Sequence, residues 1–220
     1  MPDRYWQAFS TIQGEVLGAT VLENRHVPIL EVNAGYPNAP GQIHEIKGYY
    51  AGKGRPAVLI LPEGSSLELE ASNAQFVAHA GFAVLECEPD LEPNWTGTTI
   101  TEQVGWAAAR SLAQTWCDQV GARGWEVSVS SQIARVMPGN SNILAYLAFE
   151  ADRLSGMGIA LEGSVHWLAG ETQAKRAIIK RAALDLSIPV RFRLPFEFDS
   201  EFLTMPQLER YVVWTEAKFQ

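Results

Sequence analysis

The sequence predicts an α/β (α+β) fold in which helices flank a mixed, twisted sheet. Extended and helical patterns alternate along the chain, and the apolar run Ala57 to Leu61 has the length of a buried strand. The same order of elements then returns, with Val27 corresponding to Ser164 and Ala57 to Pro189. We therefore expect two related halves, 1–95 and 96–220, that form one compact unit.

The first half begins with a helical pattern and continues with segments that glycine and proline separate. Trp6, Phe9, Ile12 and Val16 recur at steps of three and four residues, as on one face of a helix. The predicted elements are a helix over 5–17, strands over 20–24 and 27–33, a helix over 43–50, a strand over 57–62, a helix over 67–79 and a strand over 82–88.

The second half follows a stretch rich in proline, glycine and polar residues over 89–101. Its strands alternate with helices, so the crossovers between them pack on a sheet. The predicted elements are helices over 102–120 and 126–136, a hairpin of strands 143–151 and 156–162, a strand over 164–169, a helix over 172–186, a strand over 189–196, a short helix over 205–210 and a strand over 211–219.

Composition limits the classes of function. The chain has 220 residues, 17 basic and 25 acidic, and a net charge of −8, which disfavours nucleic acid and anionic membranes as partners. It shows no run long enough to span a bilayer and no export signal at Met1, so we expect a cytoplasmic protein. Cys87 and Cys117 lie apart from each other and from histidine, which predicts buried thiols and no metal site.

The second half has a distinctive order of elements. An apolar strand, a polar turn and a glycine-containing strand over 143–161 precede Val165-His166-Trp167-Leu168-Ala169-Gly170, and the helix over 172–186 and the strand over 189–196 follow. In these residues the second half resembles the GCN5-related N-acetyltransferase (GNAT) superfamily. The first half is similar to the degraded N-terminal portion of some longer members, including Ala80-Gly81-Phe82 before a strand. The resemblance implies the acyl-CoA N-acyltransferase fold, acetyl-CoA as donor, and a small amine or protein amine as acceptor.

The resemblance also implies where the cofactor binds. The family holds the pyrophosphate on a Gln/Arg-x-x-Gly-x-Gly/Ala loop, where backbone N–H groups at a helix start form an anion site. Here the strand reaches Gly170 and the helix begins near Thr172, so the glycine loop is missing and Glu171 adds a negative charge. This departure favours a catalytically silent or strongly divergent relative over an active enzyme. The corresponding cofactor positions are Leu168, Gly170, Thr172, Lys175 and Arg176.

Four basic residues nevertheless gather on the helix over 172–186, in an acidic chain: Lys175, Arg176, Lys180 and Arg181. A small anionic ligand would explain them. The alternative is the solvated face of a helix whose apolar side packs on the sheet.

For acetyl transfer the resemblance implies His166 or Glu150 as general base and Tyr211 as general acid. His166 is equally compatible with a core histidine, Glu150 with a solvated turn residue and Tyr211 with a strand aromatic. Seven tryptophans and the acidic charge are compatible with a homodimer.

Overall fold

The computed structural model describes residues 4–89, 99–104, 109–136, 143–196 and 200–217. The chain divides into two compact units, the first formed by residues 1–83 and 209–220 and the second by residues 84–208. The boundary expected between residues 95 and 96 lies outside the described residues. Each unit is described by itself.

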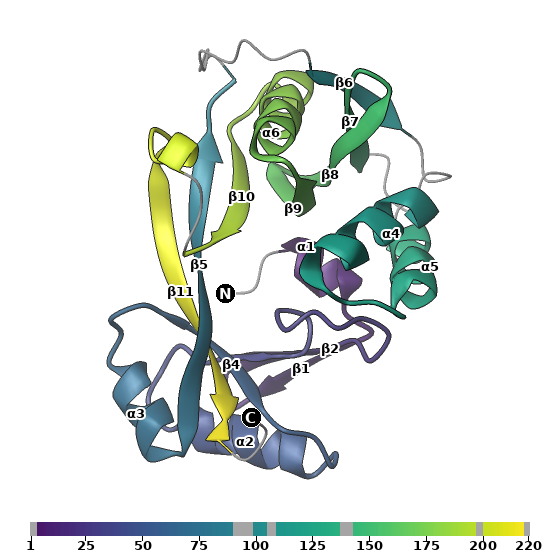
Figure 1. Cartoon of the computed structure of the whole chain (residues 1–220). Helices are drawn as coiled ribbons and strands as arrows, with labels where there is room; N and C mark the ends of the chain where they lie inside the picture. The colour runs from purple at the N-terminus through teal and green to yellow at the C-terminus, as the bar shows by residue number, and fades with distance from the viewer. Residues whose placement is uncertain (1–3, 90–98, 105–108, 137–142, 197–199, 218–220) are drawn as a thin grey trace. The chain divides into compact units, whose positions relative to one another are not determined.

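The first unit contains a mixed sheet with strand order β1-β2-β3-β4-β11. β3 runs parallel to β4, whereas β1 with β2, β2 with β3 and β4 with β11 are antiparallel. Figure 1 labels the elements. They are α1 (Arg4–Phe9), β1 (Ile12–Val16), β2 (Ala19–Glu23), β3 (Gly35–Tyr36), α2 (Gln42–Ala51), β4 (Val58–Pro62), α3 (Leu67–Asn73) and most of β5 (Phe76–Cys87) and β11 (Gln207–Glu216).

The core of the first unit forms where α2 packs on the sheet. Ile43, Ile46 and Tyr50 are fully buried, at the helical spacing of three and four residues, in one cluster with Leu59 and Leu61 of β4. β4 is buried over four consecutive residues, as its continuous apolar run predicts.

A buried carboxylate ties this sheet to α2 and the turn after it. Glu23 ends β2, is fully buried and pairs with Lys53 and with Arg55 at 3.2 Å, while the Tyr49 hydroxyl donates to it at 2.8 Å. Arg55 also donates to Asn33 at 3.0 Å. Burial acts to raise the Glu23 pKa, but the hydrogen bonds and charges of its partners outweigh burial, so its pKa lies below the usual value.

The second unit has the strand order β10-β9-β8-β7-β6, with β10 parallel to β9 and the other neighbours antiparallel. Figure 1 shows α6 lying along this sheet. Ala174 and Ile178 of α6 lie so close to Gly156 and Gly158 of β8 that a Cβ there would collide with them. The elements are β6 (Thr99–Val104), α4 (Ala109–Val120), α5 (Glu126–Val136), β7 (Leu144–Glu150), β8 (Arg153–Leu161), β9 (Ser164–Gly170), α6 (Thr172–Leu186), β10 (Val190–Pro195) and the 3-10 turn η3 (Ser200–Phe202).

The structure confirms the mixed sheet flanked by helices and differs from the predicted elements in five places. The helix over 5–17 ends at Phe9, because residues 12–16 pair with β2. The helix over 67–79 ends at Asn73, and β5 begins at Phe76. Residues 102–104 belong to β6, which pairs with β7, and residues 207–210 belong to β11 rather than to a helix. In these four cases pairing with a distant strand overrides the local pattern. The fifth difference is the strand predicted over 27–33: residues 25–33 form turns and irregular backbone, and the strand that follows, β3, comprises only Gly35–Tyr36.

We predict that Glu23→Gln lowers the free energy of unfolding by about 2 kcal/mol at neutral pH, because it leaves the Lys53 and Arg55 charges without their carboxylate. Lys53 and Arg55 keep partial contact with solvent, so the loss stays below that of a fully buried pair. A lowered pKa gives stability that is present above the carboxyl's unfolded pKa of about 4.3 and lost as the pH falls through the folded value. The difference between wild type and variant therefore shrinks below about pH 4.

Urea denaturation at neutral and acidic pH measures both effects. Glu15→Gln is the matched control, because Glu15 is an exposed residue of β1. Equal losses for Glu15→Gln and Glu23→Gln, or a difference that grows in acid, would show that the cluster does not stabilise the unit.

Candidate functional site

A bulge shapes the middle of β9, the strand that carries most of the predicted site residues. Met157 of β8 faces Ala169 and Ile159 faces His166, so β9 has one residue more than β8 between these pairs. Trp167 takes up the extra residue in a left-handed conformation (φ 54°), and its ring meets Trp116 of α4 at 4.7 Å between centroids. The bulge therefore directs Trp167 to the sheet face that α4 covers.

His166 lies on the same face. A Cβ on Gly158 would meet Val165 and Leu168 on the same side as Ile178 of α6, so His166 beside Val165 points to the opposite face. It is buried, with 4% of its surface exposed. This burial is compatible with the core histidine that the sequence gives as the alternative to a general base.

The end of β9 meets the start of α6 without an intervening loop. Gly170 is the last residue of β9 and Thr172 the first of α6, with Glu171 as the N-cap. Gly170 has φ 120°, and a Cβ here would collide with the carbonyl of Ser155 and the α-carbon of Gly156. Only glycine permits this close approach of the two strands.

Backbone groups at this junction are already bonded within the unit. Gln119 of α4 accepts the Gly170 N–H with its side-chain oxygen and donates from Nε2 to the Gly170 carbonyl at 3.3 Å. The Glu171 N–H donates to the Ser155 carbonyl at 2.9 Å. Two N–H groups next to the helix start, where the GNAT resemblance places the pyrophosphate, therefore have partners from the chain itself.

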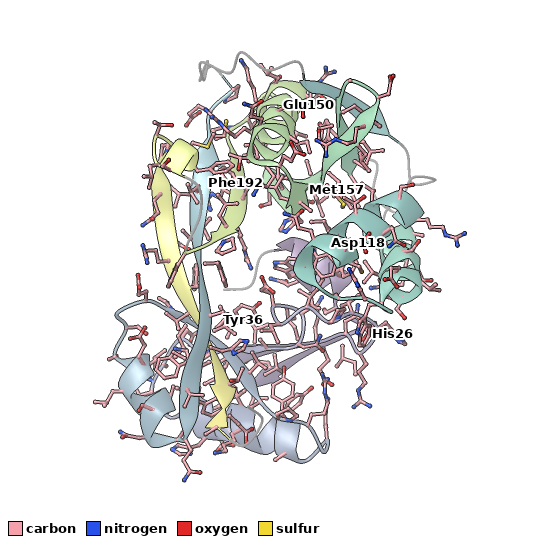
Figure 2. The ribbon with its side chains drawn as sticks, in the orientation of Figure 1. His26, Tyr36, Asp118, Glu150, Met157 and Phe192 are labelled. Carbon is pink, nitrogen blue, oxygen red and sulfur yellow. The ribbon has the colours of Figure 1, made fainter. Side chains whose placement is uncertain are left out.

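Three charged side chains gather beside this junction. Arg153, at the start of β8, pairs with Glu171 at 2.5 Å and with Glu150, the last residue of β7, at 3.5 Å. Figure 2 labels Glu150. Glu150 faces Arg153 across the hairpin and His166 faces Ile159, six residues further along β8, which is about 20 Å. Glu150 and His166 therefore cannot act on the same atom.

The remaining predicted cofactor residues lie on β9 and α6, on either side of their junction. Leu168 and Thr172 are partly buried on either side of the junction. The Lys175 ammonium lies 5.9 Å from the centre of the Phe202 ring, and Arg176 is partly buried. Arg181 is paired with Asp185 at 2.9 Å, so it adds little to any anion site on this helix.

Tyr211 belongs to the first unit. It lies on β11 opposite Pro62, its ring stacks on Phe82 at 5.4 Å between centroids, and its hydroxyl donates to Glu209. The other two predicted catalytic residues belong to the second unit. The strand aromatic expected as the alternative for Tyr211 is compatible with this packing.

β9 and β10 pair only at their beginnings. The parallel register joins Ser164 to Arg191 and Val165 to Phe192. Beyond Val165, the β9 residues for which the structure describes a partner pair with β8. The later part of β9 therefore presents one edge that β10 does not fill.

The first unit repeats the order of parallel strand, helix and strand in β3, α2 and β4. Its strand-to-helix junction also has internal partners. The side-chain oxygen of Gln42 accepts the N–H groups of Asn38 and Ala39 at 2.7 and 3.0 Å, and the Glu70 carboxylate accepts the N–H of Gly41 at 3.0 Å.

Gln119, Gln42 and Glu70 were not singled out from the sequence. Gln119 lies 51 residues before Gly170, and Glu70 lies 29 residues after Gly41, so no local pattern marks either contact. Gln42 follows Gly41 at the start of a predicted helix. This position is the one feature of the sequence that indicates a side chain bonded to backbone N–H groups there.

The two cysteines are buried, as predicted. Burial raises the pKa of each thiol to about 11, so neither is activated as a thiolate near neutral pH.

Comparison with known proteins finds similarity in structure alone. No family model matches the sequence, and no curated protein sequence does either. The chain is similar to a GCN5-related N-acetyltransferase from Kribbella flavida, with a TM-score of 0.67 and 12% identity over 97% of this chain and 93% of the other. A GCN5-related N-acetyltransferase from Sphaerobacter thermophilus gives 0.59 and 13% over 90% and 75%.

The chain has the GNAT fold. A functionally unknown conserved protein from Staphylococcus epidermidis is also similar, with a TM-score of 0.63 and 8% identity over 94% of this chain and 93% of the other. At these identities the likeness concerns the fold and leaves the activity open. Among the described residues no helix is long and apolar enough to cross a membrane, and no three potential metal ligands gather.

We predict that Gly170→Ala destabilises the protein by at least 2 kcal/mol more than Gly124→Ala, because only the former adds a steric collision. Gly124 is the matched control: it also has a positive φ, 90°, but no atom lies within 4 Å of its Cβ position. Thermal or urea denaturation of both variants measures the difference. Equal losses would mean that the contact between Gly170 and Ser155 is looser than described.

Proposed function

We propose that this GNAT-fold protein is a catalytically silent or strongly divergent relative that does not transfer acetyl groups from acetyl-CoA. The observation that carries the proposal is the internal bonding at the junction of β9 and α6. Gln119 and Ser155 bind the N–H groups of Gly170 and Glu171. Donor binding precedes any chemistry, so a blocked donor site is sufficient for silence.

Competition favours the internal partners. Gln119 and Ser155 are held beside these N–H groups by the fold, so they act at a high effective concentration, whereas a free ligand loses translational freedom on binding. The carboxylate of Glu171 next to them repels a phosphate, and its partner Arg153 is already shared with Glu150. Glu70 has the same effect at the α2 junction of the first unit.

The second candidate is an acetyl-CoA-dependent N-acetyltransferase acting on a small amine or protein amine. The divergence of β9 from β10 beyond Val165 favours it, because it leaves a strand edge for a ligand. In this case Lys175 and Arg176 would attract the phosphates as a small-anion site. His166 or Glu150 would serve as base and Tyr211 as acid, and the residues at the junction would contact the cofactor: Leu168, Gly170 and Thr172.

Isothermal titration with acetyl-CoA separates the two candidates. We expect no binding heat at millimolar ligand, because the junction is occupied and negatively charged. We also expect no thiol release when acetyl-CoA is incubated with a panel of primary amines.

A micromolar affinity would contradict the proposal and favour the acetyltransferase. In that case the double variant Lys175→Ala, Arg176→Ala should weaken binding by about tenfold or more, and more so at low salt. Arg181→Ala is the matched control, because Asp185 already neutralises that guanidinium on the same helix.

Two further expectations stand beside this proposal. We propose a cytoplasmic protein without nucleic-acid or membrane partners, from its charge of −8 and its composition. The homodimer stays a prediction, for which sedimentation velocity is the measurement.

A further inference from the structure

The first unit contains a cavity of about 330 Å³ beside the β3 to α2 segment. Its lining includes Tyr36 on β3, Ile60 on β4, Leu67 on α3 and Tyr211 on β11. This volume is at the lower end of the range for small-molecule sites. All of its lining residues belong to the first unit.

One polar group in the cavity wall has no hydrogen-bond partner among the described residues. The Ser65 hydroxyl oxygen is buried and makes no hydrogen bond to any described residue. A buried hydroxyl without a partner costs free energy unless water or a ligand satisfies it. Next to it, Ser66 lines the cavity and is exposed, so the cavity is open to solvent at this residue.

The remaining walls are apolar and aromatic. Ile60 and Leu67 are buried, with 3% and 7% of their surface exposed. The Tyr36 hydroxyl donates to the Glu31 carbonyl at 2.6 Å, and the Tyr211 ring stacks on Phe82, which fixes both aromatic side chains (Figure 2 labels Tyr36). Fixed aromatic rings together with a satisfiable hydroxyl suit a ligand that is partly apolar and partly polar.

The charged side chains around the cavity indicate the charge of the ligand that it would bind. Glu209 accepts the hydroxyl of Tyr211, and Glu70 reaches Gly41 next to the lining residue Pro40. Arg210 is the basic side chain in this group and is paired with Glu63. Four acidic residues neighbour the lining residues in the chain or bond to them or to a residue beside them. They are Glu63, Glu68, Glu70 and Glu209.

These charges exclude an anion and favour a cation. Four carboxylates against one guanidinium beside the lining residues give a negative potential, which concentrates cations and repels phosphates and carboxylates. The N–H groups of Asn38, Ala39 and Gly41, which could hold an anion, are already bonded to Gln42 and Glu70. Aromatic rings attract quaternary ammonium groups in particular, because such cations are weakly hydrated and bind to the ring face.

We propose that this cavity is a binding site for a small quaternary ammonium compound that carries a hydroxyl group. The ammonium lies beside Tyr36 and Tyr211, where the neighbouring carboxylates attract it, and the hydroxyl bonds to Ser65. The inference is independent of the proposed function, since it involves neither the second unit nor CoA.

Choline and 3,3-dimethyl-1-butanol test the proposal as a matched pair. They have the same shape and the same hydroxyl, and differ by the replacement of the ammonium nitrogen with carbon. We expect calorimetric titration of the full chain to show choline binding about tenfold more tightly than the alcohol at low salt. This ratio should fall in roughly 0.5 M NaCl, because screening weakens the attraction of the carboxylates.

Variants of the mouth locate the site. Ser66→Phe should abolish choline binding by filling the cavity, and Ser72→Phe, on the exposed face of the same helix, should leave it unchanged. Ser66 makes no side-chain hydrogen bond as the N-cap of α3, so its replacement removes no cap bond. Glu209→Gln should weaken choline binding severalfold and leave alcohol binding unchanged, and this comparison still decides if Ser66→Phe fails to fold.

Three results would overturn the proposal. The first is the absence of choline binding at millimolar concentration. The second is equal affinity for choline and the alcohol, which would make the site merely apolar. The third is unchanged choline binding in a folded Ser66→Phe variant, which would place the cation elsewhere on this acidic chain.

Discussion

Gly170 lies in close contact with Ser155 and Gly156 at the point where β9 ends and α6 begins. This contact determines how the two elements of the second unit join. Because glycine has no Cβ, the two strands can stay in contact up to the last residue of β9, and α6 begins two residues later. The same contact brings the Glu171 N–H to the Ser155 carbonyl and the Gly170 peptide to Gln119. The short connection between β9 and α6 and the bonded N–H groups therefore occur at one close contact. A longer loop would release the amides, and it would also remove the packing that orders them.

The two units satisfy a similar strand-to-helix junction in different ways. In the second unit a neutral amide, Gln119, holds the peptide of Gly170, whereas in the first unit Gln42 and the carboxylate of Glu70 bind the N–H groups before α2. A carboxylate at a helix start is stabilised by the helix dipole and by the N–H groups it accepts. These internal partners supply the charge and the acceptors that a bound phosphate would otherwise provide. Stability of the ligand-free protein and affinity for an anion therefore oppose each other at both positions.

The sequence predicts the second unit well where local and tertiary preferences agree. The prediction of a helix over 172–186 is correct at both ends. The spacing of its apolar residues and its start after Gly170 indicate the same element that the tertiary structure forms. The predicted helix over 102–120 fails over its first residues, since Glu102 pairs with Leu147 in a strand ladder that spans 45 residues. The bulge at Trp167 also escapes prediction. A left-handed tryptophan is disfavoured locally, and only its packing on Trp116 and the register of β8 account for it.

The candidate site follows the same distinction between local and distant contacts. The absence of a glycine loop is visible in the letters Gly170-Glu171-Thr172, so the sequence suffices to question CoA binding. The residues that occupy the junction come from α4 and β8, and sequence spacing gives no sign of them. The cavity of the first unit is even harder to predict from the sequence. Its walls come from β3, β4, α3 and β11, which lie up to about 175 residues apart. The charge that we infer for it depends on which carboxylates lie near its lining residues, whereas the net charge of −8 gives only the balance over the whole chain. Carboxylates near the starts of α6 and α2 disfavour the binding of a phosphate there, whereas carboxylates near this cavity would favour the binding of a cation. The acidic charge of the chain therefore weakens the CoA binding expected from the fold and supports the cation site that we propose.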